Sequence, residues 1–100
     1  MEPELKEPLS SAAAKALIRT ILEGGGVGYR KHALDEMATD KLGPISKMDV
    51  TNVLKGGVVE PAEYESGSYR YRVRTTKVTV VVAFQSSSVA VVVTAWRNAK

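Results

Sequence analysis

One histidine gives this chain its best means of moving a proton near neutral pH. His32 is the single histidine among the 100 residues, and Arg30 and Lys31 precede it. Imidazole is the side chain best suited to general acid–base catalysis at this pH. A predicted helix start and two cations beside it favour a nearby anion. We interpret His32 as a candidate general acid or base and Lys31 as an anion contact; the alternative is a capping or surface histidine.

Three arginines alternate along one predicted strand. Arg70, Arg72 and Arg74 take every second position, so an extended strand places them on one face. Like charges on one face repel one another, and a bound anion would offset that repulsion. Residues 66–100 contain six Lys or Arg and no Asp or Glu, which favours a polyanionic partner such as nucleic acid. The alternative is a solvated outer face whose cations protect the sheet edges.

The same basic segment holds the only tryptophan. Trp96 stands at the end of a predicted strand beside Arg97, and Lys77 begins the strand before it. A tryptophan there can stack on an unpaired base, as in single-strand binders. The other interpretation is that Trp96 closes the end of the core, the commoner fate of a lone tryptophan in a small domain.

Composition excludes several classes of site. The chain has no cysteine and one histidine, so disulfides and thiolate- or imidazole-based zinc sites are ruled out. No acidic cluster in the second half offers a magnesium site, and we expect no cofactor. No apolar run approaches the ~18 residues of a membrane span, and the first residues lack a signal-peptide pattern. We expect a cytoplasmic protein with no membrane partner.

Helical spacing dominates the first half of the chain. It predicts three helices, over about 10–23, from near Tyr29–His32 to Leu42, and from Ser46 to Lys55. Ser10 or Ser11 caps the first, and Ser46 with Asp49 outlines a capping box on the third. The Gly24–Gly26 run ends the first helix. It is not a phosphate loop, because such a loop follows a strand.

The second half is rich in valine, and its pattern changes to period two. This pattern predicts strands over 68–75, 77–85 and 89–97, a short edge segment over 57–61 and a polar loop over 63–67. The expected core face contains Tyr69, Tyr71, Val73, Val78, Val80, Val82, Phe84, Val89, Val91, Val93 and Ala95. We expect residues 1–9 to form a loose tail and residues 10–100 one domain. The predicted fold class is α+β, with N-terminal helices packed on one face of a three- to four-stranded antiparallel meander.

Element order and several short motifs together resemble a known superfamily. The motifs are Lys31-His32-Ala33-Leu34-Asp35-Glu36-Met37, Val58-Val59-Glu60-Pro61, Tyr69-Arg70-Tyr71-Arg72-Val73 and Val92-Val93-Thr94-Ala95-Trp96. Over residues 29–97 the chain resembles an uncharacterised-domain family related to the RelE, BrnT and MqsR toxins, within the barnase–EndoU–colicin–RelE superfamily. The resemblance implies a RelE-like fold.

The resemblance also implies an activity and partners. Members are typically metal-independent endoribonucleases of the mRNA-interferase kind, often toxins neutralised by a cognate antitoxin. Carried onto this sequence, His32 would be the general acid or base, and Arg72 or Arg74 would stabilise the phosphorane charge. Thr94 and Arg97 would hold the scissile phosphate. Thr94 stands where some relatives carry tyrosine, so the proton donor stays open. The expected partners are RNA, including ribosome-associated mRNA, and an antitoxin.

Two rival functions remain at this point. The first is a non-catalytic module of the same fold that binds nucleic acid or a protein. The second is a regulatory domain whose arginine face meets an acidic protein. An enzyme requires that His32 and the arginine face converge on one pocket, and this convergence discriminates it from both rivals.

Overall fold

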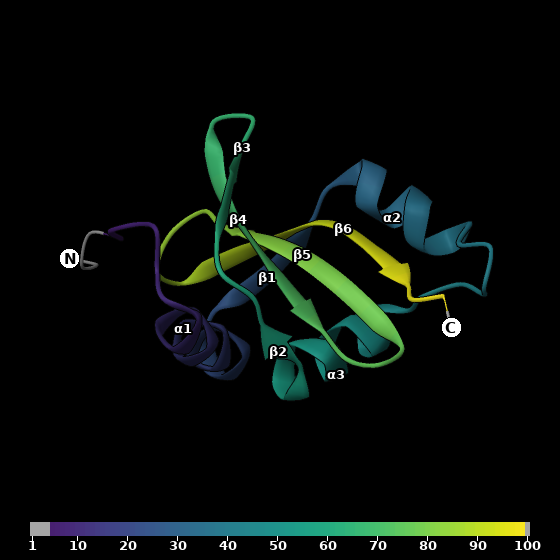
Figure 1. Cartoon of the computed structure of the whole chain (residues 1–100), viewed down its shortest axis with the longest axis horizontal. Helices are drawn as coiled ribbons and strands as arrows, with labels where there is room; N and C mark the ends of the chain where they lie inside the picture. Colours follow the sequence, from purple (N-terminus) through teal and green to yellow (C-terminus); the bar gives the residue numbers. More distant parts are fainter. Residues whose placement is uncertain (1–4, 100) are drawn as a thin grey trace.

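The computed structural model describes residues 5–99, which form three helices and a mixed β-sheet (Figure 1). The elements are α1 (Ser11–Gly24), β1 (Gly26–Tyr29), α2 (Lys31–Ala38), α3 (Lys47–Gly56), β2 (Val58–Val59), β3 (Glu63–Glu65), β4 (Ser68–Arg74), β5 (Val78–Phe84) and β6 (Val89–Arg97). The predicted α+β class is confirmed. None of the helices in the described range has the length and apolar character needed to span a bilayer.

Serine caps fix the starts of the two longer helices. At α1 the Ser10 hydroxyl accepts a hydrogen bond from the Ala13 N–H at 3.1 Å. At α3 the Asp49 N–H donates to the Ser46 hydroxyl at 3.0 Å, and the Ser46 N–H donates to the Asp49 carboxylate at 2.9 Å. These bonds satisfy amides that lack partners inside a helix, so the predicted cap and capping box are confirmed.

The sheet is larger than predicted and contains one parallel pair. Its strand order is β1-β6-β5-β4-β2, and β3 pairs with β4 alone. The antiparallel succession β4-β5-β6 matches the predicted meander, but β1 runs parallel to β6, with Gly26 opposite Val89. The predicted all-antiparallel sheet of three to four strands is therefore wrong in two respects: the sheet has six strands, and β1 is parallel to β6. The predicted polar loop over 63–67 is also wrong, because residues 63–65 pair with β4.

The glycine run after α1 allows the chain to approach β6 closely. The Gly25 N–H donates to the Ile21 carbonyl, and the Gly26 N–H donates to the Ser88 carbonyl at 2.9 Å. A Cβ on Gly25 would lie 2.2 Å from the Ser88 carbonyl oxygen, which no side chain tolerates. Glycine is therefore required where the chain turns from α1 into β1. The second helix begins at Lys31, within the predicted start near Tyr29–His32, because β1 occupies residues 26–29. It ends at Ala38, so the predicted end at Leu42 is wrong.

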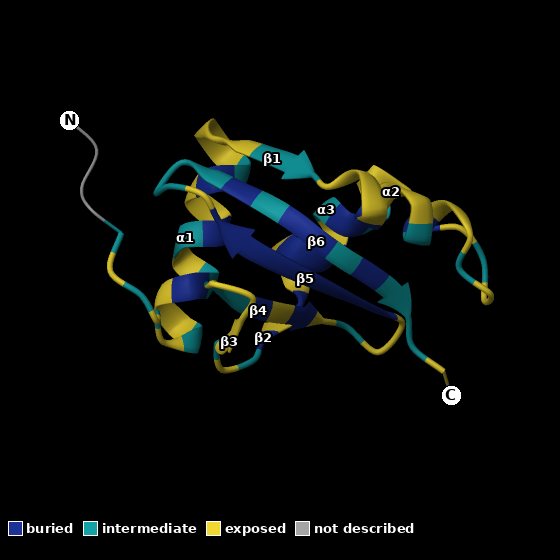
Figure 2. Ribbon diagram, turned by 90° about the horizontal axis from the view of Figure 1, so that it is seen from above, coloured by how far each residue is buried: buried dark blue, intermediate teal, exposed yellow. Residues whose placement is uncertain are grey.

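The helices surround the sheet unequally. α1 and α3 lie against one face, whereas α2 lies along the β6 edge, just after β1 (Figures 1 and 2). The main core joins helix residues to the inner face of the sheet; its members include Ala14, Ile18, Ile21, Ala33, Met37, Val50, Val53, Leu54, Tyr71, Val73, Val78, Val80, Val82, Phe84, Ala90, Val92 and Ala95. Burial of this apolar set is the main driving force for folding.

A β-bulge divides β6 into two halves. Val81 pairs with Thr94 and Val82 pairs with Val92, so Val93 is an extra residue between them. Ala90 and Val92 face the core before the bulge, and Val93 packs on the opposite face of the sheet.

This extra residue corrects the predicted register of the third long strand. Ala95, which follows the bulge, faces the core as expected. The inward orientation predicted for three β6 valines is wrong: Val89, Val91 and Val93.

Residues 5–9 are held against the core, although the sequence predicts a loose tail over 1–9. Leu5 and Leu9 pack on the core. The Tyr71 hydroxyl accepts a hydrogen bond from the Leu9 N–H at 3.0 Å and donates to the Glu7 carboxylate at 2.8 Å. Burial raises the pKa of Tyr71 to about 12, so this hydroxyl keeps its proton for the bond to Glu7. The rest of the predicted tail, residues 1–4, lies outside the described residues.

Candidate functional site

The sheet face opposite α1 and α3, called the outer face, carries three of the predicted cations: Arg70, Arg72 and Arg74. The strand register sets two rows side by side on this face: Arg72–Val81–Thr94 and Arg74–Thr79–Trp96. Val81, Ala83 and Val93 form a small apolar cluster here, and Trp96 packs against it. Trp96 therefore belongs to the outer face, and the interpretation that it closes the main core is wrong.

A hollow of about 130 Å³ opens on the outer face, and we call it the central hollow. Its lining residues are Glu63, Glu65, Arg70, Arg72, Val81, Thr94 and Trp96. The Arg72 guanidinium lies 5.9 Å from the centre of the Trp96 ring, within cation–π range. The Arg70 side chain is only 15% exposed, and its buried Nε has no hydrogen-bond partner in the described part of the chain. An unpaired buried donor is uncommon in folded proteins.

Each outer-face arginine has a carboxylate partner from the segment that precedes β4. The pairs are Arg70–Glu65 at 3.7 Å, Arg72–Glu63 at 3.6 Å and Arg74–Glu60. The chain therefore offsets the repulsion among the arginines itself, which the sequence argument did not anticipate because its acid count began at residue 66. The Arg72 and Arg74 guanidinium groups are about half exposed, so each of these two pairs contributes about 1 kcal/mol or less and a phosphate can displace the glutamate.

Glu36 connects His32 to the outer face. It follows His32 by one turn of α2, and its Oε1 lies 2.8 Å from the His32 Nε2. The same oxygen accepts a hydrogen bond from the Thr94 hydroxyl at 3.0 Å. Since Thr94 lines the central hollow, a two-bond chain joins the imidazole to that hollow. Sequence reasoning missed Glu36, although its four-residue spacing from His32 was an available signal.

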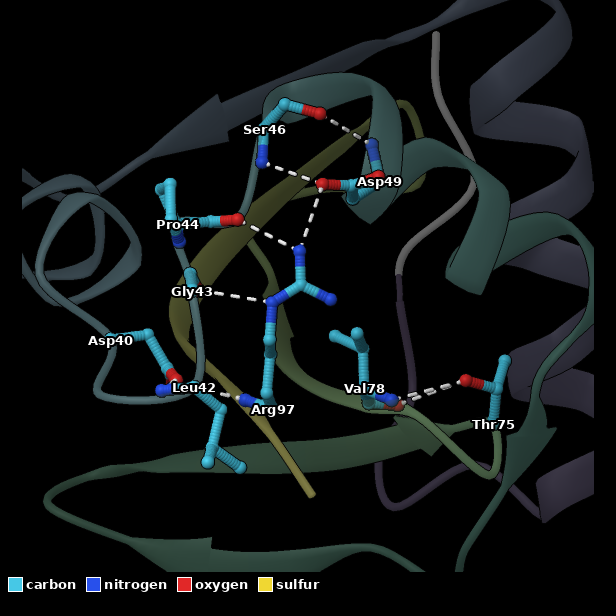
Figure 3. A network of polar contacts seen from close by, with 9 residues as sticks. All are labelled: Asp40, Leu42, Gly43, Pro44, Ser46, Asp49, Thr75, Val78 and Arg97. Carbon is cyan, nitrogen blue, oxygen red and sulfur yellow. Dashed lines mark hydrogen bonds and ion pairs between the residues drawn. The ribbon is translucent and has the colours of Figure 1, made fainter. Parts of the chain in front are cut away.

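Arg97 lies outside the central hollow and ties the α2–α3 loop to β6 (Figure 3). Its Nε donates to the Gly43 carbonyl at 3.0 Å, and its Nη2 donates to the Pro44 carbonyl at 2.8 Å. Its guanidinium also lies 3.7 Å from Asp49, and its backbone N–H donates to the Asp40 carboxylate at 3.0 Å. These bonds occupy the guanidinium, so its geometry does not favour the predicted phosphate contact.

The remaining predicted cations do not line the central hollow. Lys31 is exposed at the start of α2, Lys77 is exposed in the β4–β5 turn, and Arg74 is bound to Glu60. Of the predicted site residues, the structure brings together His32 (through Glu36), Arg70, Arg72, Thr94 and Trp96. Within residues 5–99 no group of three or more His, Cys, Asp or Glu is arranged to hold a metal ion.

Two aspartates hold the α2–α3 loop in place as carboxylates. Hydrogen bonds from the backbone N–H groups of Arg97 and Leu42 lower the pKa of Asp40. Hydrogen bonds from the backbone and side chain of Ser46 lower the pKa of Asp49. Each carboxyl group has a lower pKa in the folded protein than in the unfolded chain, where it is about 3.8. The ionised carboxylates therefore stabilise the fold above pH 3.8, and this stabilisation is lost as the pH falls below that value.

We expect Asp40→Asn to lower the melting temperature at pH 7, because the charged acceptor for the Arg97 and Leu42 amides is removed. The difference in melting temperature between this variant and the native protein should narrow as the pH falls below 3.8, since native Asp40 then becomes protonated. Thermal unfolding from pH 7 to pH 3 measures this difference. Asp35→Asn on an exposed part of α2 is the matched control. A difference that stays constant with pH would contradict the assignment.

Comparison with known proteins gives one family match. A family model described as "Domain of unknown function (DUF4258)" matches residues 29–97. The match runs from the last residue of β1 to the last residue of β6, so it includes His32, Glu36 and the whole lining of the central hollow. No curated protein and no solved structure matches the sequence significantly.

Proposed function

The chain belongs to the DUF4258 family, and we propose that it is a small metal-independent endoribonuclease of the mRNA-interferase kind, neutralised by a cognate antitoxin. One observation carries the proposal: the His32–Glu36–Thr94 chain ends in the hollow lined by Arg70 and Arg72. The candidate proton-transfer group is thus linked, through Glu36 and Thr94, to a hollow lined by candidate phosphate-binding groups. A binding module needs no such link.

Glu36 sets the tautomer of His32. A carboxylate only accepts hydrogen bonds, so the imidazole hydrogen lies on Nε2 in the bond to Glu36. The neutral ring then presents Nδ1 as an unprotonated acceptor, which is the form a general base requires. The His32 side chain is 80% exposed, so a large substrate can reach it. Glu36 also stabilises the imidazolium that forms when Nδ1 takes up a proton.

In the proposed reaction the RNA supplies its own nucleophile. The 2′-oxygen attacks the adjacent phosphorus while its proton passes to Nδ1 of His32, and the bond from phosphorus to the 5′-oxygen breaks. The 5′-oxygen takes a proton from the surrounding water, and the His32 imidazolium returns its proton to the water, leaving a 5′-hydroxyl, a 2′,3′-cyclic phosphate and neutral His32. Arg72 and Arg70 donate to the phosphate oxygens, where negative charge develops in the transition state.

The geometry favours a different role for Thr94 from the one the resemblance implies. Its hydroxyl proton is donated to Glu36, so it has no proton to offer a phosphate oxygen. We assign Thr94 to positioning Glu36, and through it His32. Trp96 offers its ring for stacking of a base in the central hollow.

The order of elements supports the proposed RelE-like relationship. The His32 helix and a capped helix precede the antiparallel succession β4-β5-β6, as the resemblance implies. The parallel strand β1 is an addition to that pattern, whereas the leading α1 also suits the MqsR-like members that the chain resembles.

Cleavage of RNA in the presence of EDTA tests the proposal. We expect purified protein to cut single-stranded RNA, to leave a 2′,3′-cyclic phosphate and to spare DNA of the same sequence, which has no 2′-hydroxyl. Growth arrest on expression, relieved by the antitoxin, is the matching result in cells. EDTA-sensitive cleavage, or no cleavage together with harmless expression, would reject the proposed enzyme.

Salt dependence tests the role of the arginines in binding. The affinity for single-stranded RNA should fall steeply with salt, and Arg72→Gln should reduce the log–log slope by about 0.7. Measurements on a His32→Ala background keep the RNA intact. Arg19→Gln, an exposed position on α1, is the charge-matched control and should leave the slope unchanged. An affinity that does not respond to salt would reject the nucleic-acid interpretation. An unchanged slope in Arg72→Gln would remove only Arg72 from the interface.

One observation favours the binding module as a second candidate. The three outer-face arginines already have glutamate partners, so this face is closer to neutral than the sequence suggested. Such pairs can be exchanged for pairs across a protein interface. The EDTA experiment separates the two candidates, because the module would bind a partner without cutting RNA.

A further inference from the structure

A second hollow adjoins the central hollow on the outer face, and we call it the flanking hollow. It measures about 340 Å³ and is lined by Arg30, Ser68, Ala83, Phe84, Gln85 and Val91. Ala83 stands opposite Val91 in the sheet. Arg70 comes one position before the Tyr71–Val82 pair, so it stands beside Ala83. Arg70 lines the central hollow and Ala83 lines the flanking hollow, so the two meet at this row.

Arg30 supplies the flanking hollow with an uncommitted cation. Its backbone N–H donates to the Val92 carbonyl at 3.1 Å, which fixes the residue at the β6 edge. Its exposed side chain forms no hydrogen bond or ion pair with any residue in the described range. Arg70, Arg72, Arg74 and Arg97 all have carboxylate partners. Arg30 can therefore bind an anion without first giving up a partner.

The remaining lining suits a nucleoside. Ala83, Phe84 and Val91 provide apolar surface, and Ser68 and Gln85 provide hydroxyl and amide groups. Val91 in the flanking hollow and Thr94 in the central hollow lie roughly 7 to 10 Å apart along β6. That separation suits adjacent nucleotides of an extended strand.

We propose that the flanking hollow is a second nucleotide subsite, in which Arg30 binds the phosphate that follows the nucleotide seated in the central hollow. This inference rests on the proposed function, and it specifies the substrate as an extended single strand. His32 stands two residues after Arg30 on the same edge. A strand that occupies both hollows therefore runs along the side of the sheet on which α2 carries the imidazole. Unpaired bases can enter both hollows, whereas a duplex keeps its bases stacked inside.

Equilibrium binding tests the subsite without requiring cleavage. The probes are adenosine monophosphate and a labelled hexanucleotide RNA, and both are measured on the His32→Ala background. Arg30→Gln should weaken hexanucleotide binding on the order of tenfold and lower its log–log salt slope by about 0.7. Binding of the mononucleotide, which fills only the central hollow, should not change. Arg19→Gln on α1 is the matched control, and unchanged thermal unfolding shows that each variant folds.

Each outcome of this experiment decides the inference. An Arg30→Gln protein that binds the hexanucleotide as tightly as the Arg19→Gln control overturns the subsite and leaves the proposed enzyme standing. Loss of hexanucleotide binding in Arg30→Gln, in a native protein that never cuts RNA, supports the subsite and rejects the enzyme. A protein that binds no RNA at low salt overturns both. An equal loss for both probes also overturns the subsite, because Arg30 would then serve the central hollow.

Discussion

The His32→Ala protein should lose on the order of 100-fold or more of its RNA-cleavage rate while remaining folded. The side chain is largely exposed, so its removal leaves no cavity in the core. Its loss removes the acceptor for the 2′-hydroxyl proton. Single-turnover cleavage in EDTA, with the enzyme in excess, measures this step directly.

Glu36→Gln provides the matched test of the positioning bond. The amide oxygen can still accept a hydrogen bond from the His32 Nε2, but it carries no charge to stabilise the imidazolium. We expect a loss on the order of 10-fold to 100-fold and a changed pH profile of the rate. Asp35→Asn, the neighbouring carboxylate on α2, should leave rate and profile unchanged. Full activity in His32→Ala would reject the assigned base.

Val80→Asp should unfold the domain. Val80 is fully buried in the main core, opposite Val73 on one side and Ala95 on the other. An aspartate there has no ionic partner, and burying it unpaired costs more than about 4 kcal/mol. A domain of this size has only about 5–15 kcal/mol of stability to lose. Circular dichroism and thermal melts measure the outcome.

Threonine at neighbouring positions gives a gentler comparison of the two sheet faces. Val80→Thr buries a hydroxyl among apolar side chains and should cost about 1–3 kcal/mol. Val81→Thr places the same hydroxyl in the central hollow beside Arg72 and Thr94, so its effect should be smaller. Equal tolerance of Val80→Asp and Val81→Thr would show that the assigned faces are wrong.

Local patterns predicted much of the fold. Alternation over residues 68–85 gives the correct faces of β4 and β5, because side chains in a strand alternate wherever pairing is regular. The capping box at Ser46 is equally local. The β6 bulge escaped prediction, because one inserted residue leaves a run of valines looking uniform. β1 escaped because two of its four residues are glycine and its partner is distant in sequence.

The sequence predicted which residues form the candidate site better than it predicted the contacts between them. His32, Arg70, Arg72 and Trp96 stand out by chemistry or by alternation, and the structure places them around one region. Glu36 becomes informative only when α2 is seen to lie beside Thr94. Arg97 resembles the other arginines in sequence, but the α2–α3 loop returns past it and binds its guanidinium. Such partners follow from how α2 and its loop dock on β6, which no local pattern specifies.

β6 is synthesised after every other helix and strand of this fold, and both β1 and Glu36 depend on it for a bonding partner. Until it leaves the ribosome, β1 has no neighbour and Glu36 lacks Thr94, a partner 58 residues later in the chain. Domains generally fold as units during synthesis, so the proposed active site is completed only when this strand has been released. A chain whose β6 has not yet emerged therefore lacks the link from His32 through Glu36 to the central hollow, even where α2 and β4 have already formed.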